Sequence, residues 1–168
     1  MTYCATAHWA PHWDDPAGGY FDLAQGQNGT AYLATRAKPV QDAPTPSPNG
    51  VAALVLARLW ALSDDRAWRD RLDRQLGAFA GVAEQLGLHG ATLARAIDWA
   101  LNPVTRIEVS GPPGEGPACA MHLAALLAYR PRKIVVRRIA PAPSATVCVG
   151  TTCSIPVSHP DALRELLA

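Results

Sequence analysis

The sequence predicts a mainly α-helical fold, part of a helical toroid, closed by a small unit that contains β-strands. Two helices, at 48–62 and 90–101, are apolar on most sides, which is typical of helices inside a structure. An amphipathic helix at 66–86 separates them, and a toroid alternates inner and outer helices in this way. The pattern then changes to strand, helix, strand. We therefore expect toroid hairpins over residues 1–103 and an α/β closure over residues 104–168.

Length and composition limit the classes of protein. The 168 residues are enough for a domain with a substantial core, and 49% hydrophobic against 17% charged residues indicates much buried surface or a missing partner surface. The net charge of +1 gives no electrostatic basis for a nucleic-acid partner. The apolar run at 51–62 is too short to span a membrane, and the N-terminus lacks the order of a signal peptide. We expect a cytoplasmic protein with no cofactor and no membrane partner.

The N-terminal residues predict a helix end followed by a glycine turn. His8 and His12 lie four residues apart, a spacing that suits zinc on a helix. Because no third ligand is near, we expect an aromatic-rich helix end that packs on its neighbours, and no metal site. We expect the aromatic residues of the turn at 14–22, among them Tyr20, to pack in the core and Asp22 to lie at the exit of the turn.

The next stretch leads into the first long helix. A short edge strand is expected at 31–35. Ser47 is a suitable N-cap, and Pro48 suits the first helical position because its missing N–H would be unpaired there. Within 51–62 the only charged side chain is Arg58. The polar entrance of this helix is therefore the first place to search for a site.

The second helix has a clear apolar stripe. Between Arg66 and Leu86, apolar residues recur at spacings of three and four, and the opposite face carries charges that we interpret as solvated. Gly87 ends this helix. The third helix ends at Asn102 and Pro103.

The C-terminal part predicts a βαβ unit with parallel strands. A strand is expected at 104–110, an apolar helix at 118–129 and a second strand at 132–139. A third short strand at 145–149 and a closing helix at 161–167 follow.

Two segments resemble a known family. The first runs from GGYFD at 18–22 into the long apolar helix, and the second is ATVCVGTTCSIPVSHPDAL at 145–163. Between its ends the first segment carries Arg36, Lys38, Asp42 and PSPNG at 46–50. Together they resemble the C-terminal part of thioredoxin-domain-containing proteins of the spermatogenesis-associated type, over residues 14–168.

The resemblance implies an (α/α)₆ toroid, similar to N-acylglucosamine 2-epimerases and six-hairpin glycosidases, behind an N-terminal thioredoxin-like domain. That domain and the first hairpins have no counterpart here, and residues 48–50 depart from the Gly and Asn-Ser that the family tends to have after Pro-Ser. We therefore expect a C-terminal fragment without activity alone, from a protein of carbohydrate-related metabolism. Without the first hairpins, such a fragment would have an unpaired apolar flank. We expect either that a partner chain completes the toroid there or that the flank acts as a protein-interaction module.

By the same resemblance, loops at one end of the inner helices form a pocket for a sugar-like small molecule. A carboxylate pair can act as acid and base in glycoside chemistry, and related epimerases use histidines, so an isomerase, epimerase or glycosidase-like enzyme is the alternative function. The competing interpretation is ordinary turn and cap chemistry. The expected ligand-binding residues are Tyr20, Arg36, Ser47 and Asn49, and the expected catalytic residues are Asp22, Asp42 and His89.

Cys148 and Cys153 lie on either side of a predicted turn. A disulfide requires their α-carbons within about 7 Å, and cytosolic cysteines more often stay reduced or bind metal. Only His159 is near enough to add a metal ligand. We rank structural thiols first, a redox pair second and a metal site third.

Overall fold

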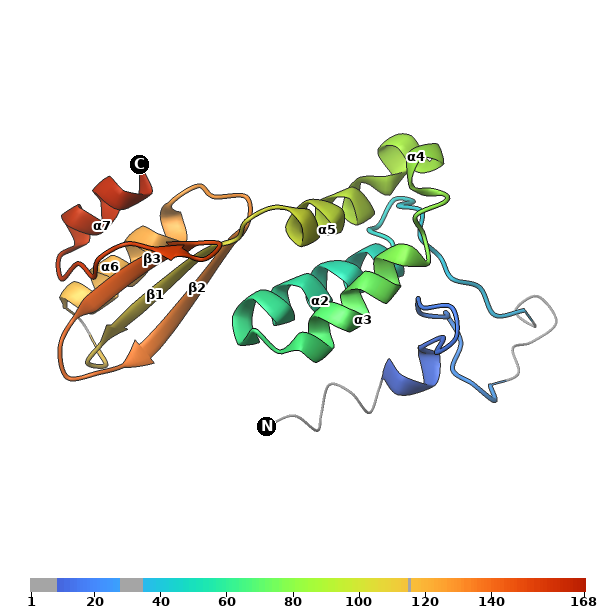
Figure 1. Cartoon of the computed structure of the whole chain (residues 1–168), viewed down its shortest axis with the longest axis horizontal. Coiled ribbons are helices and arrows are strands. Elements are labelled where there is room, and N and C mark those ends of the chain that lie inside the picture. The colour runs from blue at the N-terminus through green and yellow to red at the C-terminus, as the bar shows by residue number, and fades with distance from the viewer. Residues whose placement is uncertain (1–8, 28–34, 115) are drawn as a thin grey trace. The chain divides into compact units, whose positions relative to one another are not determined.

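The computed structural model describes residues 9–27, 35–114 and 116–168. The chain divides into two compact units, Met1–Leu101 and Asn102–Ala168, and each is described by itself (Figure 1). His8 and nearly all of the edge strand expected at 31–35 lie outside the described residues. Among the residues described, no helix combines the length and the apolar character needed to cross a membrane.

The first unit is built around helix α2, Pro48–Ser63, which packs against both α3, Arg66–Gly77, and α5, Ala91–Leu101 (Figure 1). Small side chains let the helices approach closely, and larger apolar ones fill the space between them. The unit's buried apolar residues on these helices are Ala52, Ala53, Leu56, Ala57, Leu72, Leu93, Ala96, Trp99 and Ala100. Short helical turns η1, Ala10–His12, α4, Ala83–Leu86, and η2, Gly87–Gly90, complete the unit.

Cap chemistry begins α2 as the sequence predicts. The Ser47 hydroxyl accepts a hydrogen bond from the Gly50 N–H at 3.2 Å, and Pro48 occupies the first turn. At the other end Asp64 takes a left-handed conformation, with φ 55°. The Asp65 carboxylate then accepts from the Ala67 N–H at 2.9 Å and begins α3.

The prediction of a single helix at 66–86 is wrong. The helix ends at Gly77, and turns separate it from α4. Two glycines in the sequence GAFAG weaken a helix at this point. The break also places Phe79, 5% exposed, against the glycine turn near Gly19. Tertiary packing of one aromatic ring therefore overrides the helical periodicity.

The second unit contains a four-stranded mixed sheet of order β2-β1-β3-β4. Strand β1, Thr105–Gly111, pairs in parallel with β2, Lys133–Ile139, and α6, Pro117–Leu127, connects them. This confirms the predicted βαβ unit. The antiparallel strands are β3, Ser144–Val149, next to β1, and the short β4, Thr152–Cys153.

One face of this sheet carries the core of the second unit. Alternate strand residues contact α6 and the closing helix α7, Pro160–Leu167, as period-two alternation requires. The opposite face bears the alternate residues, which include Arg106 and Glu108 on β1. The core cluster consists of Ile107, Val109, Met121, Ala125, Ala145, Val147, Leu163 and Leu167.

The prediction of a mainly α toroid is wrong, because residues 102–168 form a unit whose centre is a sheet. Helix α2 is apolar on most sides for a different reason from the one expected. It buries its alanine-rich faces against two neighbouring helices, α3 and α5, in a small layer. The alternation of apolar and amphipathic helices therefore reflects this layer and not rings of inner and outer helices.

Candidate functional site

The polar entrance of α2 is organised by the buried side chain of Asn49, which is 0% exposed. Its Oδ1 accepts the Tyr20 N–H at 2.8 Å, and its Nδ2 donates to the carbonyls of Tyr20 and Pro39, both at 2.9 Å. From α3, Gln75 donates to both Asn49 carbonyl oxygens at 3.0 Å. One amide thus joins the glycine turn, the extended lead-in and two helices.

Asp42 makes a second junction between helix N-termini. One carboxylate oxygen accepts the Ser47 N–H at 2.7 Å, and the other accepts the Thr92 N–H at 2.8 Å at the start of α5. These hydrogen bonds, that of Thr92 first, hold the pKa of Asp42 below its ordinary value, while partial burial opposes them. The positive ends of two helix dipoles favour the same ionised form.

Asp22 and Arg36 also bind backbone. The Asp22 carboxylate accepts the Ala37 N–H at 2.9 Å, so it closes the two ends of the loop between them. The Arg36 guanidinium donates to the Leu23 carbonyl at 2.9 Å and lies 3.9 Å from the centre of the Phe21 ring. Lys38 donates to the Gly18 carbonyl and forms a 2.6 Å ion pair with Asp14, which is the main cause of a lowered Asp14 pKa.

Of the expected catalytic residues, the structure brings Asp42 and His89 together. They line a depression of about 440 Å³ at the start of α5, and His89 Nδ1 lies 3.1 Å from the Asp42 carbonyl. A carbonyl only accepts, so Nδ1 carries the proton in this contact. The Asp42 carboxylate itself faces backbone donors. Asp22 lies on a different loop and does not line this depression. These contacts favour the turn and cap interpretation.

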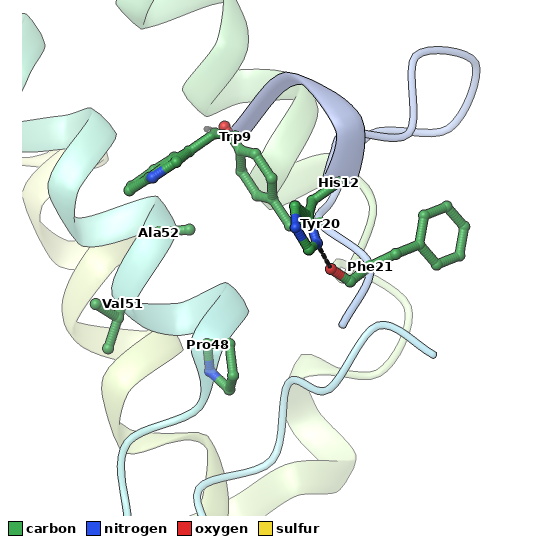
Figure 2. Close-up of a pocket in the computed structure, with 7 residues that line it drawn as sticks. All are labelled: Trp9, His12, Tyr20, Phe21, Pro48, Val51 and Ala52. Atoms are coloured by element: carbon green, nitrogen blue, oxygen red, sulfur yellow. Dashed lines mark hydrogen bonds between the residues drawn. The ribbon is translucent and has the colours of Figure 1, made fainter. Parts of the chain in front are cut away.

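A second, more apolar pocket of about 490 Å³ lies beside the N-terminal half of α2. Figure 2 shows side chains of Trp9, of Tyr20 and of α2 around a common space, while the Phe21 ring points away from it. Of the expected ligand-binding residues, only Tyr20 lines it. Its walls are Trp9, His12, Tyr20, Phe21, Pro48, Val51 and Ala52.

The aromatic wall of this pocket is held in place by packing and one hydrogen bond. The rings of Trp9 and Trp13 lie 5.5 Å and 4.9 Å from that of Tyr20, centre to centre. His12 Nδ1 donates to the Phe21 carbonyl at 2.9 Å (Figure 2), which leaves Nε2 as an acceptor in the neutral ring. Burial raises the pKa of Tyr20, and the nearby charge of Arg71 partly opposes that rise.

Cys148 and Cys153 are joined in a disulfide, with their α-carbons 3.9 Å apart, so the first-ranked prediction of structural thiols is wrong. They are directly paired residues of β3 and β4. Cys119, on α6, is an exposed free thiol. Within the described ranges, no group of three or more His, Cys, Asp or Glu side chains is placed to hold a metal ion.

Replacing Asp42 by asparagine is expected to lower the free energy of unfolding by on the order of 1 kcal/mol at pH 7, because both capping hydrogen bonds weaken. The folded pKa of Asp42 is lowered, so its contribution is full above the unfolded value near pH 4 and is lost as pH falls through the folded value. Urea unfolding at pH 7 and pH 3 should therefore show a smaller pH dependence in Asp42→Asn than in wild type. Equal pH dependence in both proteins would contradict the assignment.

Two residues of this region were missed by sequence reasoning. Gln75 lies three residues after Leu72 and so falls within the apolar stripe of its helix, which was the available signal for a buried polar group. Trp9 lines the apolar pocket, but nothing local in the sequence indicates that it meets residues of α2 some forty positions later.

Comparison with known proteins gives distant homology over nearly the whole chain. No family model matches the sequence. Spermatogenesis-associated protein 20 of Homo sapiens is 27% identical over 175 aligned positions, and that of Rattus norvegicus is 26% identical. Both alignments cover 92% of this chain but only 22% of the relative. The chain is thus a distant homologue of spermatogenesis-associated protein 20 and spans about a fifth of its length.

Proposed function

We propose that the chain is a non-catalytic interaction module that corresponds to the C-terminal portion of a thioredoxin-domain-containing protein similar to spermatogenesis-associated protein 20. In this proposal the chain docks, through one side of α2, onto the other parts of such a protein. The homology to a relative about five times as long supports an intramolecular or subunit partner of this kind. A cytoplasmic location stays part of the proposal.

The observation that carries the proposal is the outer stripe of α2, formed by Val51, Val55, Arg58 and Leu62. These positions share one side of the helix. Val51 is 42% exposed and Leu62 is 45% exposed, so the two apolar side chains are not covered by the rest of the unit. Val55 is half-buried, and Arg58 lies between Val55 and Leu62 with its guanidinium 5.2 Å from the centre of the Trp99 ring. Exposed apolar side chains gathered on one side of a helix mark an interaction site more often than scattered ones do.

The apolar pocket extends this surface, because Val51 belongs to both the stripe and the pocket wall. Its aromatic walls suit an apolar side chain inserted by the docking segment. We do not extend the proposal to sugar chemistry, because Asp22 and Asp42 use their carboxylates to hold backbone amides.

Val51→Lys tests the proposal. The wild-type chain is expected to bind an apolar fluorescent dye and to self-associate as its concentration rises, because the stripe lacks its partner. Lysine at position 51 places a second charge in the stripe, at the wall of the apolar pocket, and should reduce dye fluorescence by about half or more, without lowering the melting temperature. Dye titration and analytical ultracentrifugation measure the two effects.

Leu88→Lys is the matched control. Leu88 is 93% exposed, more than Val51, but it belongs to η2 and lies outside the stripe. The control should leave dye binding and association unchanged. A wild-type chain that stays monomeric at all concentrations and binds no dye would refute the proposal, as would equal effects of the two substitutions.

A further inference from the structure

The disulfide of the second unit lies at the end of the sheet, away from that unit's core cluster. Cys148 of β3 and Cys153 of β4 occupy facing positions in an antiparallel pair. Cys153 is exposed and Cys148 is half-buried. Neither belongs to the cluster of buried residues between the sheet and its helices. The bond is therefore accessible to a reagent in solution without opening the core.

The strands around the disulfide are also held together without it. The Ser154 N–H donates to the Val147 carbonyl at 2.8 Å, and the Val147 N–H donates to the Ser154 hydroxyl at 3.1 Å. Further along, Ala145 and Val157 exchange two backbone hydrogen bonds of 2.7 and 2.9 Å. The two cysteines are only five positions apart, so the link removes less loop entropy from the unfolded chain than a long-range disulfide would. Reduction should leave the two thiols facing each other.

The charge next to Cys148 favours its thiolate. Arg106 of β1 is the cross-strand partner of Cys148, so both side chains project from the same face of the sheet. Glu108 lies two residues further along β1 on that face and pairs with Arg106 at 3.8 Å and with Arg138. Two guanidinium groups therefore lie on this face together with the Glu108 carboxylate, and that of Arg106 belongs to the residue directly opposite Cys148. A positive neighbour lowers the pKa of a thiol and makes it a better leaving group.

We propose that Cys148 and Cys153 form a reversible thiol–disulfide exchange site that accepts two electrons from a dithiol. The exposed position of Cys153 makes its sulfur the point of attack, and the position of Cys148 beside Arg106 makes it the leaving group. This inference rests on the second unit alone and is independent of the α2 surface.

The exchange proceeds in two displacements. A thiolate of the dithiol attacks Cys153 Sγ, the Cys148–Cys153 bond breaks, and its electron pair leaves on Cys148 Sγ as a thiolate beside Arg106. The second thiol of the dithiol loses its proton, and the resulting thiolate attacks the other dithiol sulfur, which is bonded to Cys153 Sγ. That bond breaks, and Cys153 leaves as a thiolate. The dithiol is oxidised to a disulfide, and the two protons that it loses are available to the two cysteine thiolates.

The test uses the full chain with Cys4→Ser and Cys119→Ser, so that only the pair of interest can react. Dithiothreitol is added under native conditions, samples are acid-quenched and alkylated, and mass spectrometry follows the two thiols with time. We expect two alkylations after reduction, their loss after removal of dithiothreitol and reoxidation by oxidised glutathione, and an unchanged amide NMR spectrum away from the hairpin.

Variants of Arg106 test the assigned leaving group. Arg106→Gln should slow reduction about threefold to tenfold, because the thiolate of Cys148 loses its positive neighbour. Arg106→Lys keeps the charge and should restore most of the rate. Arg164→Gln removes an exposed guanidinium from α7 and should leave the rate unchanged.

Two results would overturn the proposal. If the disulfide resists dithiothreitol until a denaturant unfolds the chain, the bond is structural. If both cysteines of the air-oxidised protein alkylate at once, the pair is not a disulfide in solution. An Arg106→Gln rate equal to wild type, in a folded variant, would remove the assignment of Cys148 as the leaving group.

Discussion

Asn49→Ala is expected to lower the free energy of unfolding of the first unit by about 3–4 kcal/mol. The Asn49 side chain is fully buried and binds the Tyr20 N–H and two carbonyls, those of Tyr20 and Pro39. Alanine leaves the Tyr20 N–H and carbonyl without this partner in a space too closed for free solvation, while Gln75 keeps its hydrogen bond to the main-chain carbonyl of residue 49 and the Pro39 carbonyl keeps the residue 49 N–H. All five tryptophans belong to residues 1–101, so tryptophan fluorescence during urea unfolding reports on this unit.

Gln41→Ala is the control for this substitution. Gln41 carries the same amide group on an exposed position of the lead-in, so its loss should change stability by less than about 0.5 kcal/mol. Near-equal effects of the two substitutions would show that Asn49 does not organise the turn. The loss of unfolding free energy in Asn49→Ala, compared with that in Gln41→Ala, shows what the buried hydrogen bonds contribute beyond the general cost of removing a polar side chain.

Gly18→Ala is expected to cost about 3 kcal/mol in the same assay, for steric reasons. Gly18 has φ +74°, in the left-handed region, and a Cβ built there would lie 2.4 Å from the carbonyl oxygen of Arg74 on α3. Backbone atoms of a helix cannot move aside as a flexible side chain does. The glycine turn must therefore separate from α3 to accept any side chain at this position.

Gly26→Ala isolates the part of this cost that comes from backbone conformation. Gly26 has φ +83°, similar to that of Gly18, but no atom lies within 4 Å of a Cβ placed there. We expect a loss of about 1 kcal/mol. If both alanine variants lose the same stability, the close approach of the turn to α3 does not contribute, and the packing described for this turn is incorrect.

Local chemistry explains what the sequence could predict. Ser47 and Pro48 specify the start of α2 through interactions within one helical turn. The order of strand, helix and strand specified a parallel β1–β2 pair, because a crossover helix returns the chain to the end of the sheet at which the first strand began. These features depend on residues that are close in the sequence or on a general rule of chain connection.

Long-range partners explain what could not be predicted. The carboxylate of Asp42 binds the N–H of Thr92, fifty residues later, and nothing near Asp42 indicates that partner. The apolar character of α2 fits both an inner toroid helix and a helix packed between two neighbours. Only the contacts of α2 with α3 and α5 decide between them. Similarly, Phe79 continues the helical stripe in sequence, but in the structure it packs beyond the end of α3.

The polar side chains around the entrance of α2 recognise the path of the main chain more than the identity of other side chains. Asn49, Asp42, Arg36 and Lys38 all bond to backbone N–H or carbonyl groups. Substitution of a residue that offers only its backbone, such as Leu23, leaves such a bond available. Natural variation in this region should therefore be uneven, with the four recognising residues retained and the residues whose backbone they bind free to drift.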